Sequence, residues 1–307
     1  MLHYKQPEDA AMPSVLITGT SSGIGMATAL AFGRAGYRVY ATMRDPRRGS
    51  ELRRIVEQEK LPVALSTLDV DSDASVKESI GRITREGGSI DVLVNNAGAA
   101  PTGSVEEAPL SLFRSTMETN YFGVIRCVQA VLPAMRERRS GCIINISSVA
   151  GRIAMSPMAP YNATKFALEG LSESLAQEVK PFNIRVAVVQ PGIISTPMAR
   201  QIADGQSRSA YPQSNRISAL FTAALQTPRP PSLVGDKVLE ICESGTWQLR
   251  HPVGPDAAFF LGWRQSMNDE EWVAWGALDD DGWYDRVKAD FGMDARPWSR
   301  TAEMPAV

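Results

Sequence analysis

Cysteine and histidine are scarce in this chain of 307 residues, which contains three of the first and two of the second. The widely spaced Cys127, Cys142 and Cys242 form neither a disulfide framework nor the close spacing of a structural zinc site. Unpaired cysteines are typical of a reducing compartment. We therefore expect a cytoplasmic protein without a metal centre.

The chain also lacks an excess of charge and a long apolar run. Its 32 Lys and Arg against 34 Asp and Glu give a formal net charge of -2, which disfavours nucleic acid and anionic membranes as partners. No run of about 18 apolar residues is present, so no membrane span is predicted. The polar N-terminal dozen has no apolar core of a secretory signal.

Short apolar runs alternate with helix-like stretches through the first two-thirds of the chain. The runs are continuously apolar, which is typical of strands covered on both faces. They lie at 14–19, 37–43, 63–70, 90–98, 141–148 and 184–192, with helix-like stretches at 27–36, 73–86, 109–137 and 159–180. This alternation predicts an α/β, Rossmann-type doubly wound parallel sheet flanked by helices.

The last third of the chain has a different composition. Residues 197–232 are rich in Pro, Ser and Gln, and all six tryptophans lie from Trp247 onward. We place one domain at 13–250 and a Trp-rich extension at 251–307, packed on the body or on a partner subunit. In the alternative interpretation, one or two tryptophans line the substrate pocket. The acidic run at 279–281 is expected to be solvated.

A glycine-rich turn, TGTSSGIG at 18–25, joins the first strand to the first helix. Glycine lets the backbone turn tightly and approach a phosphate, and free N–H groups at a helix start hold the anion. We expect a cofactor pyrophosphate here, although a plain strand-to-helix turn is the alternative. The expected contacts are Gly19, Ser21, Ser22, Gly23, Ile24 and Gly25.

The end of the second strand indicates which dinucleotide is bound. NAD-binding folds usually have an acidic residue here for the ribose hydroxyls, whereas this chain has neutral residues and then Arg44. An arginine suits the 2′-phosphate of NADP, and Ser21 adds a hydroxyl. NADP is therefore predicted in preference to NAD. Asp45 weakens this inference, and Arg44 is also consistent with a solvated surface residue.

Tyr161 and Lys165 lie four residues apart in a segment with helical spacing, so they share one face of a helix. A free tyrosine, with a pKa of about 10, is a poor acid at neutral pH. A nearby cation stabilises the phenolate and lowers that pKa. The pair indicates an acid–base catalyst, and a solvated surface pair is the alternative.

These segments together resemble the classical short-chain dehydrogenase/reductase family. The glycine-rich turn, LDV at 68–70, NNAG at 95–98, Asn120, Ser148, YNATK at 161–165 and PGIIST at 191–196 occur in that family's order and approximate spacing. The resemblance covers about residues 13–200. Within the family, YATMRDP at 40–46 and KFALEGLSESLA at 165–176 resemble the 17β-hydroxysteroid and retinol dehydrogenase branch.

The resemblance implies a catalytic set of four residues. Tyr161 would exchange a proton with the substrate oxygen, and Ser148 would stabilise charge on that oxygen. Lys165 would bind the nicotinamide ribose and lower the pKa of Tyr161. Asn120 would organise a water that links Lys165 to solvent. Ser147 is adjacent to Ser148, but the spacing to Tyr161 favours Ser148.

The resemblance also extends the expected cofactor site. Asp69 would bond the adenine amino group with Val70 beside the ring, while Ile194 and Thr196 would contact the nicotinamide carboxamide. Further residues implied at the cofactor are Asn96, Ala97, Gly98, Tyr161, Lys165, Pro191 and Gly192. Asn96 is also consistent with a capping or turn residue.

An apolar substrate pocket is expected around the reacting groups. The candidates, which are also consistent with core residues, are Ile153, Met155, Met158, Ile193 and Met198. Such a lining suits a hydrophobic carbonyl compound or alcohol. Residues 197–215 occupy the position of the family's mobile substrate loop. The helices that carry Asn120 and Phe166 form a dimer interface in the family, so a homodimer or homotetramer is expected.

Three functions are consistent with these sequence features. The leading one is an NADP(H)-dependent oxidoreductase that interconverts an apolar ketone or aldehyde and its alcohol. The second is an NAD-dependent enzyme that oxidises a small polar secondary alcohol. The third, of a different class, is a catalytically silent NADP-binding sensor or scaffold. Loss of Tyr161, Lys165 or Ser148 would favour the third, and all three residues are present.

Overall fold

The computed structural model describes residues 12–205 and 209–299. These residues form a seven-stranded parallel sheet and the helices around it. Its strand order is β3-β2-β1-β4-β5-β6-β7, and the order reverses direction between β1 and β4, as in a doubly wound sheet. The predicted fold class is confirmed. The strands are β1 (Ser14–Thr18), β2 (Arg38–Met43), β3 (Val63–Thr67), β4 (Val92–Asn95), β5 (Gly141–Ile146), β6 (Ile184–Pro191) and β7 (Arg250–Val253).

The seventh strand was not predicted from the sequence. β7 pairs in parallel with β6, from Val188 opposite Arg250 to Pro191 opposite Val253. Its four residues, RHPV, do not form an apolar run, so the periodicity gave no signal. β7 spans the position at which we placed the start of the extension, so the first residues of that segment belong to the sheet.

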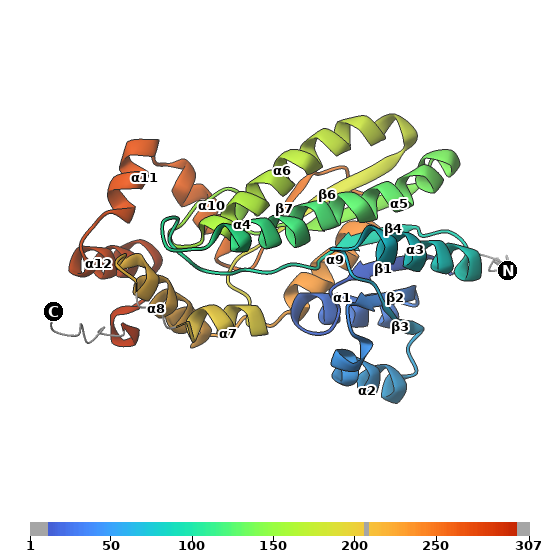
Figure 1. Ribbon diagram of the computed structural model, residues 1–307, viewed down its shortest axis with the longest axis horizontal. Helices are drawn as coiled ribbons and strands as arrows, with labels where there is room; N and C mark the ends of the chain where they lie inside the picture. The colour runs from blue at the N-terminus through green and yellow to red at the C-terminus, as the bar shows by residue number, and fades with distance from the viewer. Residues whose placement is uncertain (1–11, 206–208, 300–307) are drawn as a thin grey trace, which may run out of the picture.

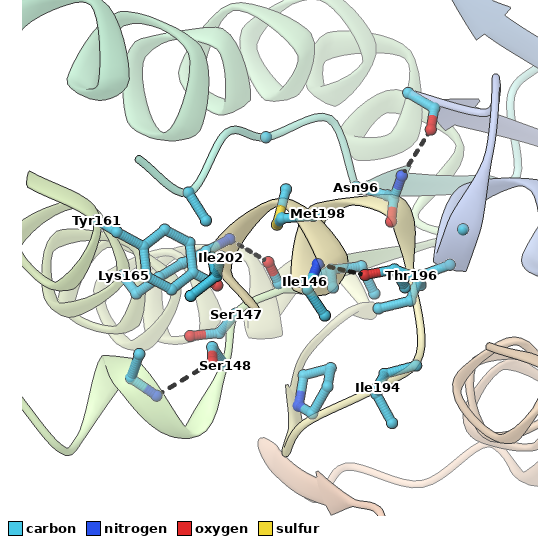
Figure 2. Close-up of a pocket in the computed structure, with 18 of the residues that line it drawn as sticks. Asn96, Ile146, Ser147, Ser148, Tyr161, Lys165, Ile194, Thr196, Met198 and Ile202 are labelled. Carbon is cyan, nitrogen blue, oxygen red and sulfur yellow. Dashed lines mark hydrogen bonds between the residues drawn. The ribbon is translucent and has the colours of Figure 1, made fainter. Parts of the chain in front are cut away.

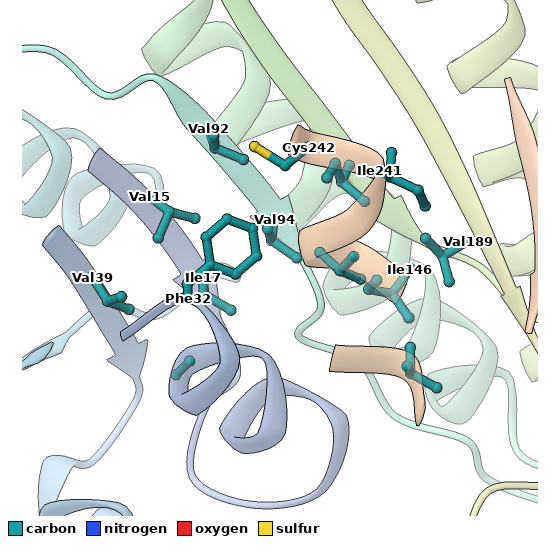
Figure 3. Packing of buried hydrophobic residues seen from close by; sticks show 14 of the residues in the cluster. Val15, Ile17, Phe32, Val39, Val92, Val94, Ile146, Val189, Ile241 and Cys242 are labelled. Atoms are coloured by element: carbon teal, nitrogen blue, oxygen red, sulfur yellow. The ribbon is translucent and has the colours of Figure 1, made fainter. Parts of the chain in front are cut away.

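Helices cover both faces of the sheet (Figure 1). One face packs against α1 (Gly23–Arg34), α2 (Ser50–Glu59) and α9 (Ser232–Ser244). The other packs against α3 (Asp73–Gly87), α5 (Gly123–Arg138) and α6 (Ala159–Val179). Successive strand residues serve opposite faces, because side chains alternate along a strand: Val15 and Ile17 join the first cluster (Figure 3) and Leu16 the second.

The helical stretch predicted at 109–137 is divided in the structure. It consists of α4 (Leu110–Met117), one π-helical turn at Glu118–Phe122 and then α5. A π-helical turn inserts an extra residue into a helix and is frequent at functional sites. Asn120 lies within this turn and is buried.

The remaining helices gather beyond one end of the sheet (Figure 1). They are α7 (Pro197–Ala203), α8 (Gln213–Leu225), α10 (Ala257–Gln265), α11 (Asp269–Gly276) and α12 (Asp280–Phe291). A third hydrophobic cluster joins Leu220 of α8 to Trp275 and Trp283 of the C-terminal segment. The Trp-rich segment therefore packs on its own chain, and the expected substrate loop contains α7 and the start of α8.

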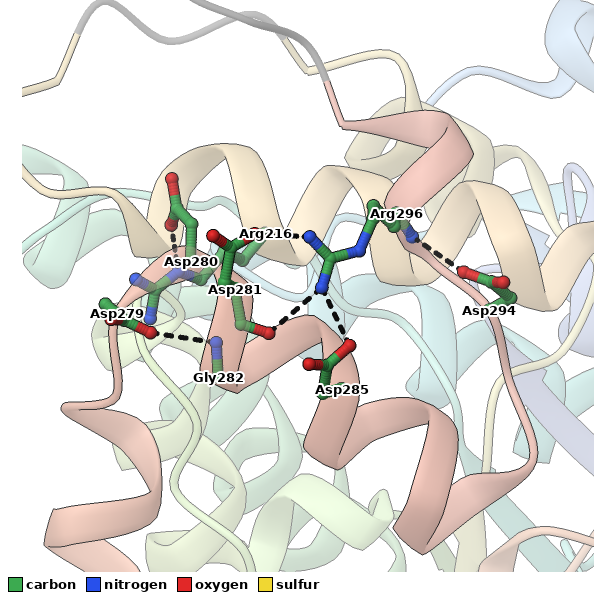
Figure 4. Close-up of polar contacts among 8 residues, drawn as sticks. All are labelled: Arg216, Asp279, Asp280, Asp281, Gly282, Asp285, Asp294 and Arg296. Atoms are coloured by element: carbon green, nitrogen blue, oxygen red, sulfur yellow. Dashed lines mark hydrogen bonds and ion pairs between the residues drawn. The ribbon is translucent and has the colours of Figure 1, made fainter.

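The acidic run has structural partners although its side chains are exposed. Asp279 caps α12 by accepting a hydrogen bond from the Gly282 N–H. Asp280 forms an ion pair with Arg216, and Asp281 forms one with Arg296 (Figure 4). The run is therefore more than a solvated surface.

Substitution of two helical glycines tests the packing of α9 on α1. A Cβ at Gly235 would lie 2.8 Å from the backbone carbon of Ala27, whereas one at Gly262 would meet nothing within 4 Å. We expect Gly235→Ala to lower the free energy of unfolding by about 1–3 kcal/mol through overpacking. Gly262→Ala should raise it by about 0.5–1 kcal/mol. Urea unfolding measures both, and equal effects would contradict this packing.

Candidate active site

A cavity of about 360 Å³ lies beyond the carboxyl ends of the strands. Its walls include residues that follow β1, β2, β4, β5 and β6. Open α/β sheets bind their ligands at this edge, beyond the carboxyl ends of the strands. Nearly all of the predicted site residues line this cavity; Gly25 and Asn120 do not. Thus segments far apart in the sequence meet at one edge of the sheet.

The glycine-rich turn is held against the chain that follows β4. Gly19 has a φ of +72°, and a Cβ there would lie 2.7 Å from the Ala97 Cα. The Asn96 side-chain amide donates hydrogen bonds to the carbonyl oxygens of Thr18 (2.9 Å) and Gly19 (3.0 Å). Asn96 is therefore a turn-stabilising residue as well as a cavity residue (Figure 2).

Gly25, an expected cofactor contact, does not line the cavity and has a packing role in the structure. A Cβ at Gly25 would lie 2.4 Å from the Asn96 amide nitrogen and from the Gly19 carbonyl oxygen. Its hydrogen leaves room for the bonds that fix the turn. The start of α1 remains open, since Ser22 makes no side-chain cap and the first turn has no acidic residue. Free N–H groups there suit a pyrophosphate.

Two arginines line the cavity near the end of β2. Arg44 was predicted, whereas Arg48, which lies in the PRRG segment just after it, was missed. Asp45 does not neutralise Arg44: its carboxylate pairs with Arg47 at 2.9 Å, and this hydrogen bonding lowers the pKa of Asp45. Among the described residues, no carboxylate forms an ion pair with Arg44 or Arg48.

The part of the cavity expected to hold adenine contains one further carboxylate. Asp69 and Val70 line the cavity as expected, together with Asp71. The Asp69 side chain accepts a hydrogen bond from the Asp71 N–H at 3.1 Å. Thr119, on the π-helical turn, donates to Asp71 at 3.0 Å. The LDV motif thus predicted that Asp69 and Val70 line the cavity, but only the fold shows that Thr119 contacts the neighbouring Asp71.

Tyr161, Lys165 and Ser148 surround one part of the cavity (Figure 2). Tyr161 and Lys165 lie one turn apart on α6, and Ser148 follows β5. The Lys165 Nζ donates a hydrogen bond to the Ile146 carbonyl oxygen at 2.8 Å and lies 5.6 Å from the Tyr161 ring centroid. The sequence pattern and the fold therefore place these three groups together.

The pKa of Tyr161 lies above its ordinary value, whereas we expected Lys165 to lower it. Desolvation raises the pKa of Tyr161 to about 12, and hydrogen bonding with Ser148 opposes that rise. Desolvation also lowers the pKa of Lys165 to about 8, against the nearby Glu169 charge. Desolvation raises one pKa and lowers the other because burial penalises the charged form of each group.

The two adjacent serines face different surroundings. Ser148 accepts a hydrogen bond from the Ala150 N–H at 3.1 Å, which leaves its hydroxyl proton free to donate. Ser147 is 3% exposed, and a Cβ at Gly151 would lie 2.7 Å from its hydroxyl oxygen. Both residues line the cavity, but the Ser148 hydroxyl is the one that influences the pKa of Tyr161.

Asn120 does not line the cavity and acts through its neighbours. Its side chain accepts a hydrogen bond from the Ala99 N–H and donates to the Ala99 carbonyl oxygen, both at 2.8 Å. It also donates to the Thr164 hydroxyl at 3.0 Å. Asn120 therefore joins the chain after β4 to α6, the helix of Tyr161 and Lys165. The expected water-organising role stays a prediction.

The chain after β6 is supported by a residue that the sequence did not indicate. Asp256 accepts a hydrogen bond from the Ile193 N–H at 2.8 Å. A Cβ at Gly192 would lie 2.3 Å from an Asp256 carboxylate oxygen, so only glycine permits this approach. The Thr196 hydroxyl oxygen caps α7 by accepting from the Ala199 N–H at 3.2 Å, and its proton remains available to a ligand.

The substrate end of the cavity is more apolar than the sequence predicted. All five predicted residues line it, and the C-terminal segment adds aromatic side chains. The additional residues are Ile202, Ile217, Leu220, Phe221, Phe260, Trp263 and Phe291. Trp263 fits the alternative interpretation, in which one or two tryptophans line the pocket. The others were missed because no local pattern indicates which face of α7, α8, α10 or α12 meets the cavity.

No group of His, Cys, Asp and Glu side chains suited to a metal ion occurs within residues 12–205 and 209–299. Over the same ranges, no helix is long and apolar enough to cross a bilayer.

The sequence matches the family model described as short chain dehydrogenase over residues 13–207. The chain belongs to this family. It is therefore an NAD(P)-dependent oxidoreductase that acts on CH–OH or C=O groups. The predicted resemblance to the family is confirmed, and its relatives include retinol dehydrogenases.

Similar proteins cover most of the chain. A 3-ketodihydrosphingosine reductase of Bacteroides thetaiotaomicron is 43% identical over 245 residues, 78% of this chain and 87% of the relative. Retinol dehydrogenase 8 of Homo sapiens is 40% identical over 223 residues, 71% of each chain. The crystal structure of a short-chain dehydrogenase from Streptomyces avermitilis has a TM-score of 0.74 and 32% identity, and covers 88% of this chain and 97% of that one.

Gly19 gives a test of the cofactor turn. In Gly19→Ala, a positive φ and a Cβ 2.7 Å from Ala97 Cα would displace the turn. We expect NADPH to bind at least about tenfold more weakly, which corresponds to about 1.4 kcal/mol. The control is Gly36→Ala, which shares a positive φ, of +84°, but meets nothing within 4 Å. Fluorescence titration that shows equal affinities for both variants would contradict this role.

Proposed function

We propose that this enzyme is an NADP(H)-dependent oxidoreductase that interconverts an apolar ketone or aldehyde and its alcohol, with Tyr161 as the acid–base catalyst. The observation that carries the proposal is that Tyr161, Ser148 and Lys165 line one cavity together with the glycine-rich turn and a group of apolar side chains. The turn fits a dinucleotide because its helix start is uncapped and crowding excludes side chains at Gly19 and Gly25.

The side chains account for proton transfer in both directions. Bound nicotinamide supplies or accepts the hydride. A substrate oxygen between the Tyr161 and Ser148 hydroxyls accepts a hydrogen bond from each, which stabilises the negative charge that develops during reduction. Tyr161 is protonated at neutral pH and donates its proton to that oxygen, and the hydrogen bond with Ser148 opposes the desolvation that raises the Tyr161 pKa to about 12. In oxidation the proton returns to Tyr161.

The NADP preference rests on the two cavity arginines. Arg44 and Arg48 offer charge-assisted hydrogen bonds to a 2′-phosphate. The competing acid, Asp45, is engaged by Arg47. No acidic side chain therefore stands free at the end of β2 among the described residues. This arrangement favours NADP over the NAD-dependent alternative.

The apolar substrate follows from the walls of the pocket. Trp263, Phe260 and Phe291 close it on the side of the C-terminal segment, and Met155 and Met158 line it beside α6. Apolar walls with a few polar groups bind hydrophobic small molecules. One relative is named as the reductase of a keto compound and another as a retinol dehydrogenase. Both names agree with a carbonyl or alcohol substrate.

A homodimer or homotetramer and a cytoplasmic location complete the proposal. Most of the apolar stripe on α6 is used within the chain, since Leu168, Leu175 and Val179 are buried. Phe166 and Phe122 remain 44% exposed and give the expected interface its apolar contacts. The three cysteines are free and buried, which fits a reducing compartment.

Tyr161→Phe tests the proton donor. We expect the rate of ketone reduction with NADPH to fall by about 10²–10⁴-fold, since general acid catalysis typically contributes that much. NADPH affinity should stay near that of the wild type, because the ring and Lys165 remain. Stopped-flow measurement of nicotinamide absorbance follows the reaction.

The adjacent serines provide the matched control for that test. Ser148→Ala removes a donor to the substrate oxygen and should also lower the rate strongly. Ser147→Ala removes a hydroxyl directed toward Gly151 and should have a much smaller effect. Tight NADPH binding without turnover by the wild type on any carbonyl substrate would favour the silent sensor instead.

Arg44→Leu tests the cofactor preference. Loss of a charge-assisted hydrogen bond should weaken NADPH binding by about tenfold or more and leave NADH binding nearly unchanged. Arg53→Leu is the control, because Arg53 is also exposed but lies outside the cavity. Calorimetric titration gives all of these affinities. Tighter binding of NADH than of NADPH by the wild type would reject the preference.

A further inference from the structure

A second cavity of about 260 Å³ lies next to the substrate pocket. Its walls come from the segment before α6, from α8, and from the tryptophans of α11 and α12. These three tryptophans, Trp272, Trp275 and Trp283, give it an aromatic surface. The cavity therefore arises only because the C-terminal segment folds over α8.

The cavity contains a buried arginine with an unused donor. Arg216 is 3% exposed, and its Nε donates to Asp280 at 2.7 Å (Figure 4). Its guanidinium carbon lies 5.8 Å from the Trp283 ring centroid. The Nη1 is buried and has no hydrogen-bond partner among the described residues. An unsatisfied charged donor is costly, so this atom suits a ligand acceptor.

Gln213 presents an unused acceptor in the same cavity. It lies one turn before Arg216 on α8, and its amide nitrogen donates to the Gly276 carbonyl oxygen at 3.4 Å. The Gln213 Oε1 is buried and has no partner among the described residues. The walls thus offer one donor and one acceptor. A hydroxyl group satisfies both, because it accepts and donates, whereas a carboxylate has no proton for Gln213.

The second cavity and the substrate pocket share a wall residue, and a second residue of the pocket packs against the tryptophans of the second cavity. Met155 lines both cavities. Trp263 lines the substrate pocket and makes edge contacts with Trp272 and Trp275, at centroid distances of 5.6 Å and 5.1 Å. Methionine is unbranched and adapts to irregular space. Met155 is therefore a shared wall residue that can adapt its shape to a ligand on either side.

We propose that this cavity is the far end of the substrate site and binds a hydroxyl group carried by an elongated apolar substrate. The substrate oxygen that reacts lies at Tyr161, the apolar body passes Met155, and the distal hydroxyl accepts from Arg216 and donates to Gln213. This inference rests on the proposed function, and it narrows the substrate to apolar carbonyl compounds with a distal alcohol.

Equilibrium binding tests the distal site without requiring turnover. The probes are straight-chain methyl ketones of increasing length, each compared with its counterpart that has a terminal hydroxyl. They are titrated into the full-length protein saturated with NADP⁺, and tryptophan fluorescence reports binding because three tryptophans line the cavity. Turnover of the same compounds with NADPH is measured in parallel.

At the chain length that spans both cavities, the hydroxyl compound should bind about tenfold more tightly than its parent, as a hydrogen bond to a charged group allows. Gln213→Met and Arg216→Met should each remove most of this preference. Arg216→Met leaves no buried charge behind, since the Asp280 side chain is 65% exposed. Gln226→Met is the control, because Gln226 lies at the exposed end of α8, outside the cavity.

Equal binding of both compounds at every length would overturn the inference. In that case the Arg216 Nη1 and the Gln213 Oε1 would have water as their only hydrogen-bond partner. A preference that survives in Gln213→Met and Arg216→Met would also overturn it. A hydroxyl preference lost in these variants, without turnover of any compound, would support the distal site and reject the proposed reaction. The two proposals therefore fail separately.

Discussion

The site depends on the close approach of the glycine-rich turn to the chain that follows β4. Gly19 and Gly25 leave room for this approach, and the Asn96 amide fixes it by bonding the carbonyl oxygens of Thr18 and Gly19. These contacts hold the start of α1 at the cavity, with its first N–H groups uncapped. A larger side chain at either glycine would push the anion-binding helix start away from the strands that carry the reacting groups.

A buried network extends the same support along α6. Glu169 lies one turn beyond Lys165, is 4% exposed, and accepts a hydrogen bond from Gln190 of β6 at 3.0 Å. It also pairs with Arg250 of β7 at 2.8 Å. A buried carboxylate is tolerated because both oxygens have partners. The last strand, although short and polar, thereby fixes the helix that presents Tyr161 and Lys165.

The C-terminal segment gives the shared fold its particular pocket. Its helices close the substrate end with Trp263, Phe260 and Phe291. Behind Trp263, the rings of Trp272, Trp275 and Trp283 pack against one another, and together with α8 they enclose the cavity that holds Arg216. Aromatic side chains bury large areas and retain defined geometry. The specificity of the enzyme is therefore expected to reside largely outside the segment that defines the family.

The sequence by itself determined the parallel sheet, the glycine-rich turn and the Tyr161–Lys165 pair, because each depends on local periodicity or on residues close in the chain. Only the tertiary structure decided that β7 completes the sheet, that Gly25 packs rather than lines the cavity, and that desolvation raises the pKa of Tyr161. It also decided which aromatic residues line the cavity. These properties depend on contacts between distant segments and on the exclusion of water, which no local pattern encodes.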